Sequence, residues 1–146
     1  MAGTTIHIDL GALESINKRL ATLTRADTHG LLETIGAAVE SQTRRRMTED
    51  KTGPDGAAWD DWSPKYAATR HGGHSLLESQ GHLVDSIHFA VEGDQVRIGS
   101  ELVYAATHQH GDESRNIPAR PYLGLSEQDR NEIKDVADDY LRSLVP

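Results

Sequence analysis

In the N-terminal third of the chain, the spacing of the hydrophobic residues changes from every second position to every third or fourth. Residues 4–10 place Ile6 and Ile8 on the same side of an extended chain, because every second residue points the same way. Apolar residues then recur every three or four positions over 11–24, and again over about 28–48, which is the spacing of one helix face. The pattern therefore predicts a short strand followed by two helices.

The second of these helices ends in three consecutive arginines. Asp27 or Thr28 supplies a side-chain oxygen for its N-cap, and twenty residues at 1.5 Å each would span ~30 Å. Arg44, Arg45 and Arg46 suit the negative end of the helix dipole, and they are also candidates to meet an acidic partner surface. Successive residues point in different directions around a helix, so we expect that the three are not all buried.

The C-terminal half begins with a strand pattern and ends with a helix pattern. Alternating residues around a Gly-Asp turn predict a β-hairpin over about 84–99, followed by one or two helical turns at 104–108. Two prolines make 117–125 an extended or edge segment. Ser126 then caps a last helix, with Asp129 three residues on. The apolar face of this helix comprises Ile133, Val136, Ala137, Tyr140, Leu141 and Leu144.

A long stretch at about 50–75 lacks any clear period. Its Gly-Pro-Asp-Gly sequence is turn chemistry in which Gly53 and Gly56 allow left-handed backbone. Three of the chain's seven aromatic residues follow within eight positions, namely Trp59, Trp62 and Tyr66. These side chains either anchor a contact with another protein or fold back to close the domain's own core, and the sequence leaves both open. Three nearby acids argue against base stacking along a phosphate backbone.

These elements together predict an α+β fold. We expect two N-terminal helices and one C-terminal helix to pack on a small antiparallel sheet, with the long Gly/Pro/Trp loop outside it. The chain has 146 residues, the size of one domain, so we expect a single domain over 1–146.

Composition and charge exclude several functions. There is no Cys, which excludes a disulfide framework, a Cys-ligated zinc and a thiol nucleophile. The formal net charge of −8 argues against binding nucleic acid over the whole surface, and we expect no sequence-specific recognition of it. No stretch approaches the ~18 consecutive apolar residues of a membrane span, so we expect no membrane association.

Eight histidines raise the question of a metal site. His71 and His74, and also His108 and His110, have spacings that zinc accepts. The helical His-Glu-x-x-His pattern is absent, and polar loop residues are the more ordinary explanation. The sequence also lacks a Gly-x-Ser-x-Gly elbow and a phosphate-binding Gly-Lys-Ser/Thr loop. We therefore expect no enzymatic activity, no catalytic residue, no metal and no cofactor.

Four motifs occur in a fixed order and carry a family resemblance. They lie at 53–64, 76–87, 96–111 and 117–126, and the last, Ile-Pro-Ala-Arg-Pro-Tyr-Leu-Gly-Leu-Ser, is the most specific. Over about residues 30–144 the chain resembles the phage virion morphogenesis family, the tail completion proteins of Mu-like phages and prophages.

The resemblance implies a structural protein of the virion. It implies action at the neck in tail completion or head–tail joining, after assembly in the cytoplasm of the bacterial host. The implied partners are other copies in a homo-oligomeric ring, with a hexamer as one candidate, and the tail tube, terminator and head connector proteins. Two alternatives stay open, namely head (capsid) assembly and a His-metal hydrolase acting in lysis.

A ring subunit needs two complementary surfaces, which the sequence suggests lie on two segments. We expect loop 51–74 and segment 117–124 to form them, because a Gly/Pro/Trp loop can reach a neighbour and stiff prolines can hold Arg120 toward a carboxylate. The candidate interface residues are Trp59, Trp62, Tyr66, Arg44, Arg45, Arg46, Arg120 and Tyr122.

Overall fold

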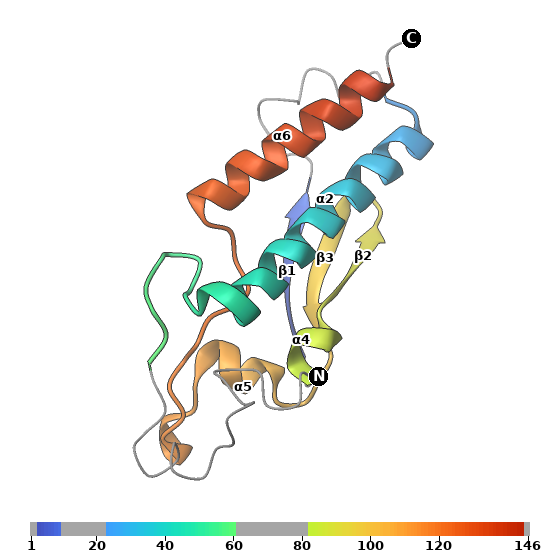
Figure 1. The fold of residues 1–146 in the computed structure, drawn as a ribbon. Coiled ribbons are helices and arrows are strands. Elements are labelled where there is room, and N and C mark those ends of the chain that lie inside the picture. Colours follow the sequence, from blue (N-terminus) through green and yellow to red (C-terminus); the bar gives the residue numbers. More distant parts are fainter. Residues whose placement is uncertain (1–2, 10–22, 61–81, 145–146) are drawn as a thin grey trace.

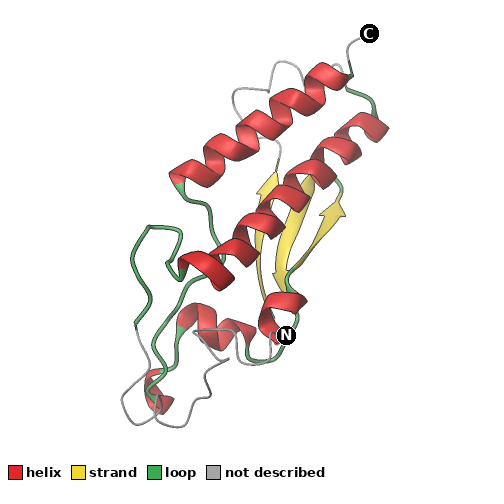
Figure 2. Cartoon of the chain, in the orientation of Figure 1, coloured by secondary structure: helices red, strands yellow, loops and turns green. Residues whose placement is uncertain are grey.

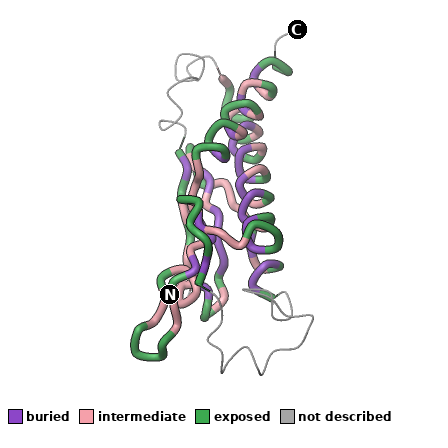
Figure 3. Tube along the Cα trace, turned by 60° about the vertical axis from the view of Figure 1, so that its left-hand side comes forward, coloured by how far each residue is buried: buried purple, intermediate pink, exposed green. Residues whose placement is uncertain are grey.

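The computed structural model describes residues 3–9, 23–60 and 82–144, which form two layers (Figure 1). One layer is a three-stranded antiparallel sheet and the other consists of two long helices lying across it, as the rotated view in Figure 3 also shows. The sheet contains β1 (Thr4–Asp9), β2 (His88–Glu92) and β3 (Gln95–Ser100). The long helices are α2 (Arg25–Arg45) and α6 (Glu127–Ser143), and the short ones are α4 (His82–Ser86) and α5 (Ala105–His110).

The expected α+β fold is confirmed in its main parts, namely a long helix and a C-terminal helix on a three-stranded sheet. The strand expected at 4–10 is β1, and the expected hairpin is β2 and β3. The helix expected over 11–24 falls almost wholly outside the described residues. Its last two positions are not helical, and Thr24 instead begins the next helix.

The beginning of α2 corrects the expected N-cap. Thr24 is the cap, and its hydroxyl accepts a hydrogen bond of 3.0 Å from the Asp27 N–H. The Asp27 carboxylate accepts one of 3.3 Å from the Thr24 N–H, which completes a capping box. The expected start at Asp27 or Thr28 was therefore three or four residues late, because Asp27 occupies the third helical position of the box.

The hairpin expected over about 84–99 begins later, at His88, and ends at Ser100. Residues 82–86 form the helix α4, so β2 begins only at His88. The turn between β2 and β3 contains Gly93, whose φ of +62° favours glycine. Farther on, segment 117–125, expected to be extended or an edge strand, lies outside the sheet. The helical turns expected at 104–108 are α5, which begins one residue later and ends at His110.

The core lies between α2, α6 and the sheet (Figure 3). Antiparallel pairing places Ile6 and Phe89 on either side of Ile98, and it places Ile8 and Val91 on either side of Val96. This face of the sheet receives the apolar stripe of α2, in which the buried residues are Leu31, Leu32, Ile35 and Val39. From α6 the core receives Ile133, Ala137 and Leu141.

The chain turns sharply after α2. The helix continues into a π-helical turn, Arg46–Asp50, and Lys51 then takes a left-handed φ of +55°. Gly56 has the expected left-handed backbone with a φ of +86°, whereas Gly53 is not among the residues with positive φ. Thr52 and Ala58 form an isolated bridge that closes this part of the loop.

Candidate functional site

The three arginines at the end of α2 have three different environments. The side chain of Arg46 is only 5% exposed, whereas those of Arg44 and Arg45 are each 43% exposed. The expectation that not all three are buried is therefore confirmed. The sequence did not indicate which one enters the core.

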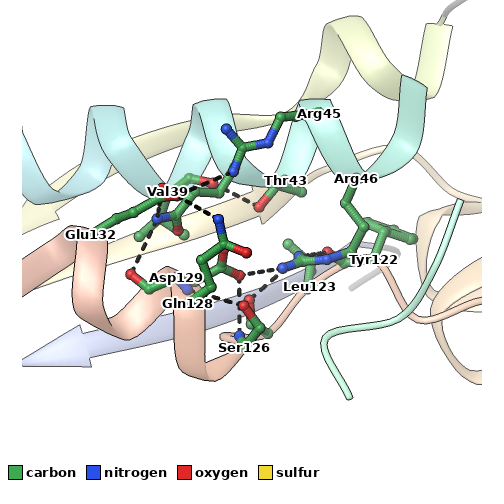
Figure 4. Close-up of polar contacts among 12 residues, drawn as sticks. Val39, Thr43, Arg45, Arg46, Tyr122, Leu123, Ser126, Gln128, Asp129 and Glu132 are labelled. Atoms are coloured by element: carbon green, nitrogen blue, oxygen red, sulfur yellow. Dashed lines mark hydrogen bonds and ion pairs between the residues drawn. The ribbon is translucent and has the colours of Figure 1, made fainter. Parts of the chain in front are cut away.

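Arg46 joins α2 to the segment that precedes α6 and to α6 itself (Figure 4). Its guanidinium donates to the Tyr122 carbonyl at 2.6 Å and to the Asp129 carboxylate, and it lies 3.5 Å from the Gly124 carbonyl. Asp129 also accepts the Ser126 N–H at 3.1 Å. We call Arg46, Tyr122, Gly124, Ser126 and Asp129 the arginine clamp. Because Asp129 belongs to the capping box of α6, the clamp fixes where that helix starts.

A second set of polar contacts runs beside the clamp. Gln42 is buried on the apolar stripe of α2 and donates to the Asp129 carbonyl at 3.2 Å and to the Glu132 carboxylate at 3.0 Å. Arg45 lies 3.6 Å from the same Glu132 carboxylate (Figure 4). These contacts fix the rotation of α6 against α2. Gln42 was not among the predicted site residues, although a polar residue on the apolar stripe of a helix is a signal that could have indicated it.

Arg44 points toward the sheet. Its guanidinium donates to the Ile87 carbonyl at 2.6 Å, just before β2, and it lies 3.3 Å from the Glu40 carboxylate on its own helix. Arg44 therefore connects the C-terminal end of α2 with one border of the sheet.

The described part of loop 51–74, which ends at residue 60, packs against segment 117–124 within one chain. The Trp59 indole N–H donates to the Pro121 carbonyl at 2.9 Å, and the Arg120 Nε donates to the Asp60 carbonyl at 2.9 Å. Trp59 and Arg120 are each 7% exposed. Trp59 thus folds back into the chain's own core, which is one of the two alternatives that the sequence left open.

Tyr122 lies at the centre of this packing and is fully buried. Its hydroxyl donates to the Ala105 carbonyl at 2.7 Å, and burial raises the pKa of the phenol well above its usual range. The Gln109 side chain accepts the N–H groups of Tyr122 and Leu123, both at 3.0 Å, and donates to the Leu123 carbonyl at 3.2 Å. Gln109 therefore aligns the proline-rich segment along α5, a role that the sequence did not reveal.

His108 is the most unusual histidine among the described residues. Its Nδ1 is buried without a hydrogen-bond partner, and its ring stands edge-on to Tyr104 with centroids 5.8 Å apart. Burial lowers the pKa of His108, and the positive charge of Arg120 lowers it further. Both effects favour the neutral imidazole.

The described residues give no support to a metal centre. Within 3–9, 23–60 and 82–144, no three His, Asp or Glu side chains gather closely enough to hold an ion. His71 and His74 lie outside the described residues, as do Trp62 and Tyr66 of the expected interface. No helix in the described part of the chain is long and apolar enough to cross a membrane.

The predicted interface set thus divides into three groups. Arg46, Trp59, Arg120 and Tyr122 are buried against other parts of their own chain. Arg44 and Arg45 keep exposed surface. For all of these residues, and for the two aromatic residues outside the description, contact with another subunit stays a prediction.

Comparison with known proteins finds a matching family and several similar proteins. A model of the phage virion morphogenesis family matches residues 8–142. The "Putative capsid assembly protein G" of Escherichia phage Mu is 31% identical over 140 residues, which are 89% of this chain and 88% of that protein.

Two prophage proteins of Haemophilus influenzae are also similar. Mu-like prophage FluMu G protein 2 is 29% identical over 147 residues, covering 96% of this chain and 99% of the relative. FluMu G protein 1 is 29% identical over 113 residues, covering 74% and 76%. No solved structure matches the chain closely enough to count as a relative. The match over 8–142 confirms the family that the four motifs indicated, and the chain belongs to the phage virion morphogenesis family.

Proposed function

We propose that this protein acts in virion assembly at the neck, where it completes the tail or joins it to the head as an oligomeric ring. The observation that carries the proposal is the family match over residues 8–142, because the family is one of structural morphogenesis proteins. The partners would be further copies of the chain, the tail tube and terminator proteins, and the head connector.

The internal contacts suit a protein that presents a fixed surface. The arginine clamp and the Trp59–Pro121 bond tie four separate parts of the chain together through buried polar contacts. Such contacts hold backbone segments in one arrangement, because breaking them would leave buried polar groups without partners. In this proposal the buried residues of the predicted interface position the surface, while Arg44 and Arg45 are available to touch a neighbour.

A second candidate is assembly of the head. It is favoured by the name of the phage Mu relative, which refers to capsid assembly. The two functions differ in the stage at which the protein is needed. A neck protein is needed to finish the tail or attach it to the head, and a capsid assembly protein is needed to build the head.

The experiment that separates them is electron microscopy of lysates from a phage or induced prophage lacking this gene product. We expect filled heads and separate tails, with whole virions restored when the intact chain is supplied from a plasmid. Aberrant or missing heads would instead support capsid assembly. Infectious particles at the normal yield would contradict both functions.

Self-assembly is tested separately on the purified protein. Light scattering and native mass spectrometry would show a ring as one defined multiple of the 16.0 kDa chain. A chain that remains a monomer at all concentrations, and also in extracts that contain its phage partners, would contradict the ring.

A further inference from the structure

β1 and β2 are the two edge strands of the sheet, because β3 lies in the middle (Figure 2). We call the outer side of each edge strand a border of the sheet. Glu92 and Gln95 pair directly across the two-residue turn, so they exchange hydrogen bonds. In an antiparallel ladder, bonded and non-bonded pairs alternate. Ala90 and His88 are therefore bonded to β3, while Phe89 and Val91 direct their N–H and C=O groups away from it.

The same alternation determines which residues of β1 direct their backbone groups outward. Because Arg97 and Gly99 of β3 bond to β2, Ile98 and its even-numbered neighbours bond to β1. Ile6 pairs with Ile98, so Thr5 and His7 direct their N–H and C=O groups outward. In the described ranges, no hydrogen bond joins the outward groups of Thr5, His7, Phe89 or Val91 to another part of the chain.

Arg44 shows where the open part of the β2 border begins. Ile87 follows the same alternation as Phe89 and Val91, and its carbonyl accepts the Arg44 guanidinium at 2.6 Å. Beyond this point β2 reads His-Phe-Ala-Val-Glu and has none of the lysines, prolines or bulges that usually protect an exposed sheet border. Its three central residues are apolar and only half-buried. The border is therefore suited to receive another strand.

We propose that β2 of one copy pairs with β1 of the next, so that the sheet continues from subunit to subunit. Each copy carries both open borders, on opposite sides of one sheet, and each border offers backbone groups at alternating positions. This contact joins two different surfaces, which is the kind of contact that can close a ring. The inference therefore rests on the proposed oligomeric assembly and names its interface.

The side chains at the two borders fit such a junction. β1 and β2 both run antiparallel to β3, so the new pairing is parallel. Phe89 and Ile6 are half-buried and lie on the face of the sheet that the helices cover. In a continuous sheet these two apolar side chains come from adjacent strands on the same face and bury each other's remaining surface.

Hydrogen exchange provides the first test, because neighbouring amides give opposite predictions. In dilute monomer we expect fast exchange at Phe89, Val91, Thr5 and His7, and slow exchange at Ala90, which is bonded to β3. On assembly the four fast amides should slow by roughly tenfold or more, while Ala90 stays slow.

Two exchange results would overturn the proposal. Protection of Phe89 and Val91 in the monomer would show that another part of the same chain covers the border. Protection of these two without Thr5 and His7, together with a dimeric mass, would show two-fold pairing of β2 with β2.

The second test compares His7→Pro with His7→Ala. His7 is exposed, and its N–H has no partner within the described chain, so proline removes only the donor that the next copy would use. We expect His7→Ala to assemble, and we expect His7→Pro to remain monomeric with fast exchange at Phe89 and Val91. Slow exchange at Ala90 reports that the variant is folded, and Thr5→Pro is a second variant of the same design.

The outcomes separate this interface from the proposed function. If His7→Pro and Thr5→Pro assemble like the parent chain, the strand pairing is wrong although the ring remains. If the parent chain itself never assembles, the ring is wrong, and the exchange data then show both borders open at every concentration.

Discussion

Arg46 shows how one buried charge organises the polar part of the core. Its guanidinium has a carboxylate and a backbone carbonyl as partners, so the positive charge is compensated where water is excluded. Asp129 in turn keeps its bond to the Ser126 N–H. Removing water from the two charges offsets much of their attraction, so the pair adds little net free energy of folding. Its main effect is to favour one particular arrangement of the two helices.

Replacing Arg46 by Met should destabilise the protein strongly. The substitution leaves the Asp129 carboxylate buried without its cation, and we expect the free energy of unfolding to fall by about 3–5 kcal/mol in urea denaturation. Arg46→Met combined with Asp129→Asn removes both charges and keeps a capping oxygen, so it should recover part of the loss. A single-variant loss below about 1 kcal/mol would contradict the role of the pair.

His108 should make stability depend on pH. Its pKa is lowered in the folded state by burial and by Arg120, so below about pH 6.5 the unfolded chain takes up a proton that the folded chain resists. The free energy of unfolding should therefore increase between about pH 5.5 and 7.5, and this increase should be smaller in His108→Gln. The exposed His110→Gln is the matched control. Equal pH profiles for His108→Gln and the parent would refute this contribution.

At the scale of elements, α2 approaches its two neighbours through glycines. An added Cβ at Gly36 would lie 2.5 Å from the Phe89 ring and 2.9 Å from a Val96 methyl. At Gly30 it would lie 2.0 Å from the Tyr140 hydroxyl, which is the far end of a half-buried side chain on α6. The sheet therefore meets α2 at a rigid contact, whereas α6 meets it partly through a side chain that can move.

The two glycines should respond differently to alanine. Alanine adds about 1 kcal/mol of helix propensity at either position, but at Gly36 overpacking against the sheet costs about 1–3 kcal/mol. We expect Gly36→Ala to lower the melting temperature. We expect Gly30→Ala to leave it nearly unchanged, because the Tyr140 hydroxyl must move aside and this offsets the gain in helix propensity. Differential scanning calorimetry of the pair measures this, and a stabilised Gly36→Ala protein would show that the helix and sheet have room to separate.

At the scale of the whole molecule, we expect buried residues to contribute to stability and exposed arginines to contribute to assembly. Trp59 belongs to the core and bonds to Pro121, whereas Arg45 holds one exposed ion pair with Glu132. Stability and assembly should therefore be separable by substitution.

Trp59→Ala and Arg45→Ala should differ in stability and in assembly. We expect Trp59→Ala to lose about 3–5 kcal/mol of unfolding free energy, and Arg45→Ala to lose less than about 1 kcal/mol. Arg45→Ala should nevertheless reduce the assembled fraction in native mass spectrometry. Arg142→Ala removes an exposed arginine from α6 and is the matched control. Equal assembly of the two arginine variants would exclude Arg45 from the interface.

Local patterns were sufficient for most of the described elements. The alternation around Ile6 and around Val96 and Ile98 gave the strands, and Ser126 with Asp129 gave the capping box of α6. The N-cap of α2 was misplaced because Thr24, Asp27 and Thr28 are all good capping residues. Only the geometry of the first turn distinguishes them.

The residue types of the candidate site could be predicted from the sequence, but their contacts could not. Arginines and aromatic residues were expected to matter, yet their partners lie far away in sequence, with Arg46 and Asp129 separated by 83 positions. A sequence pattern repeats over a few residues, so it does not report such a pair. At Gln42 the sequence carries part of the signal, because a polar residue on an apolar helix stripe indicates a buried hydrogen bond, but it does not name the partner.

The sequence by itself determined the strand and helix periods, the absence of cysteine chemistry and the family. These depend on neighbouring residues or on a fixed order of motifs. Only the tertiary structure decided which arginine is buried, that Trp59 packs within its own chain, and which backbone groups of the sheet have no hydrogen-bond partner in the described part of the chain. Those outcomes depend on burial and on strand register, which arise when distant segments exclude water together.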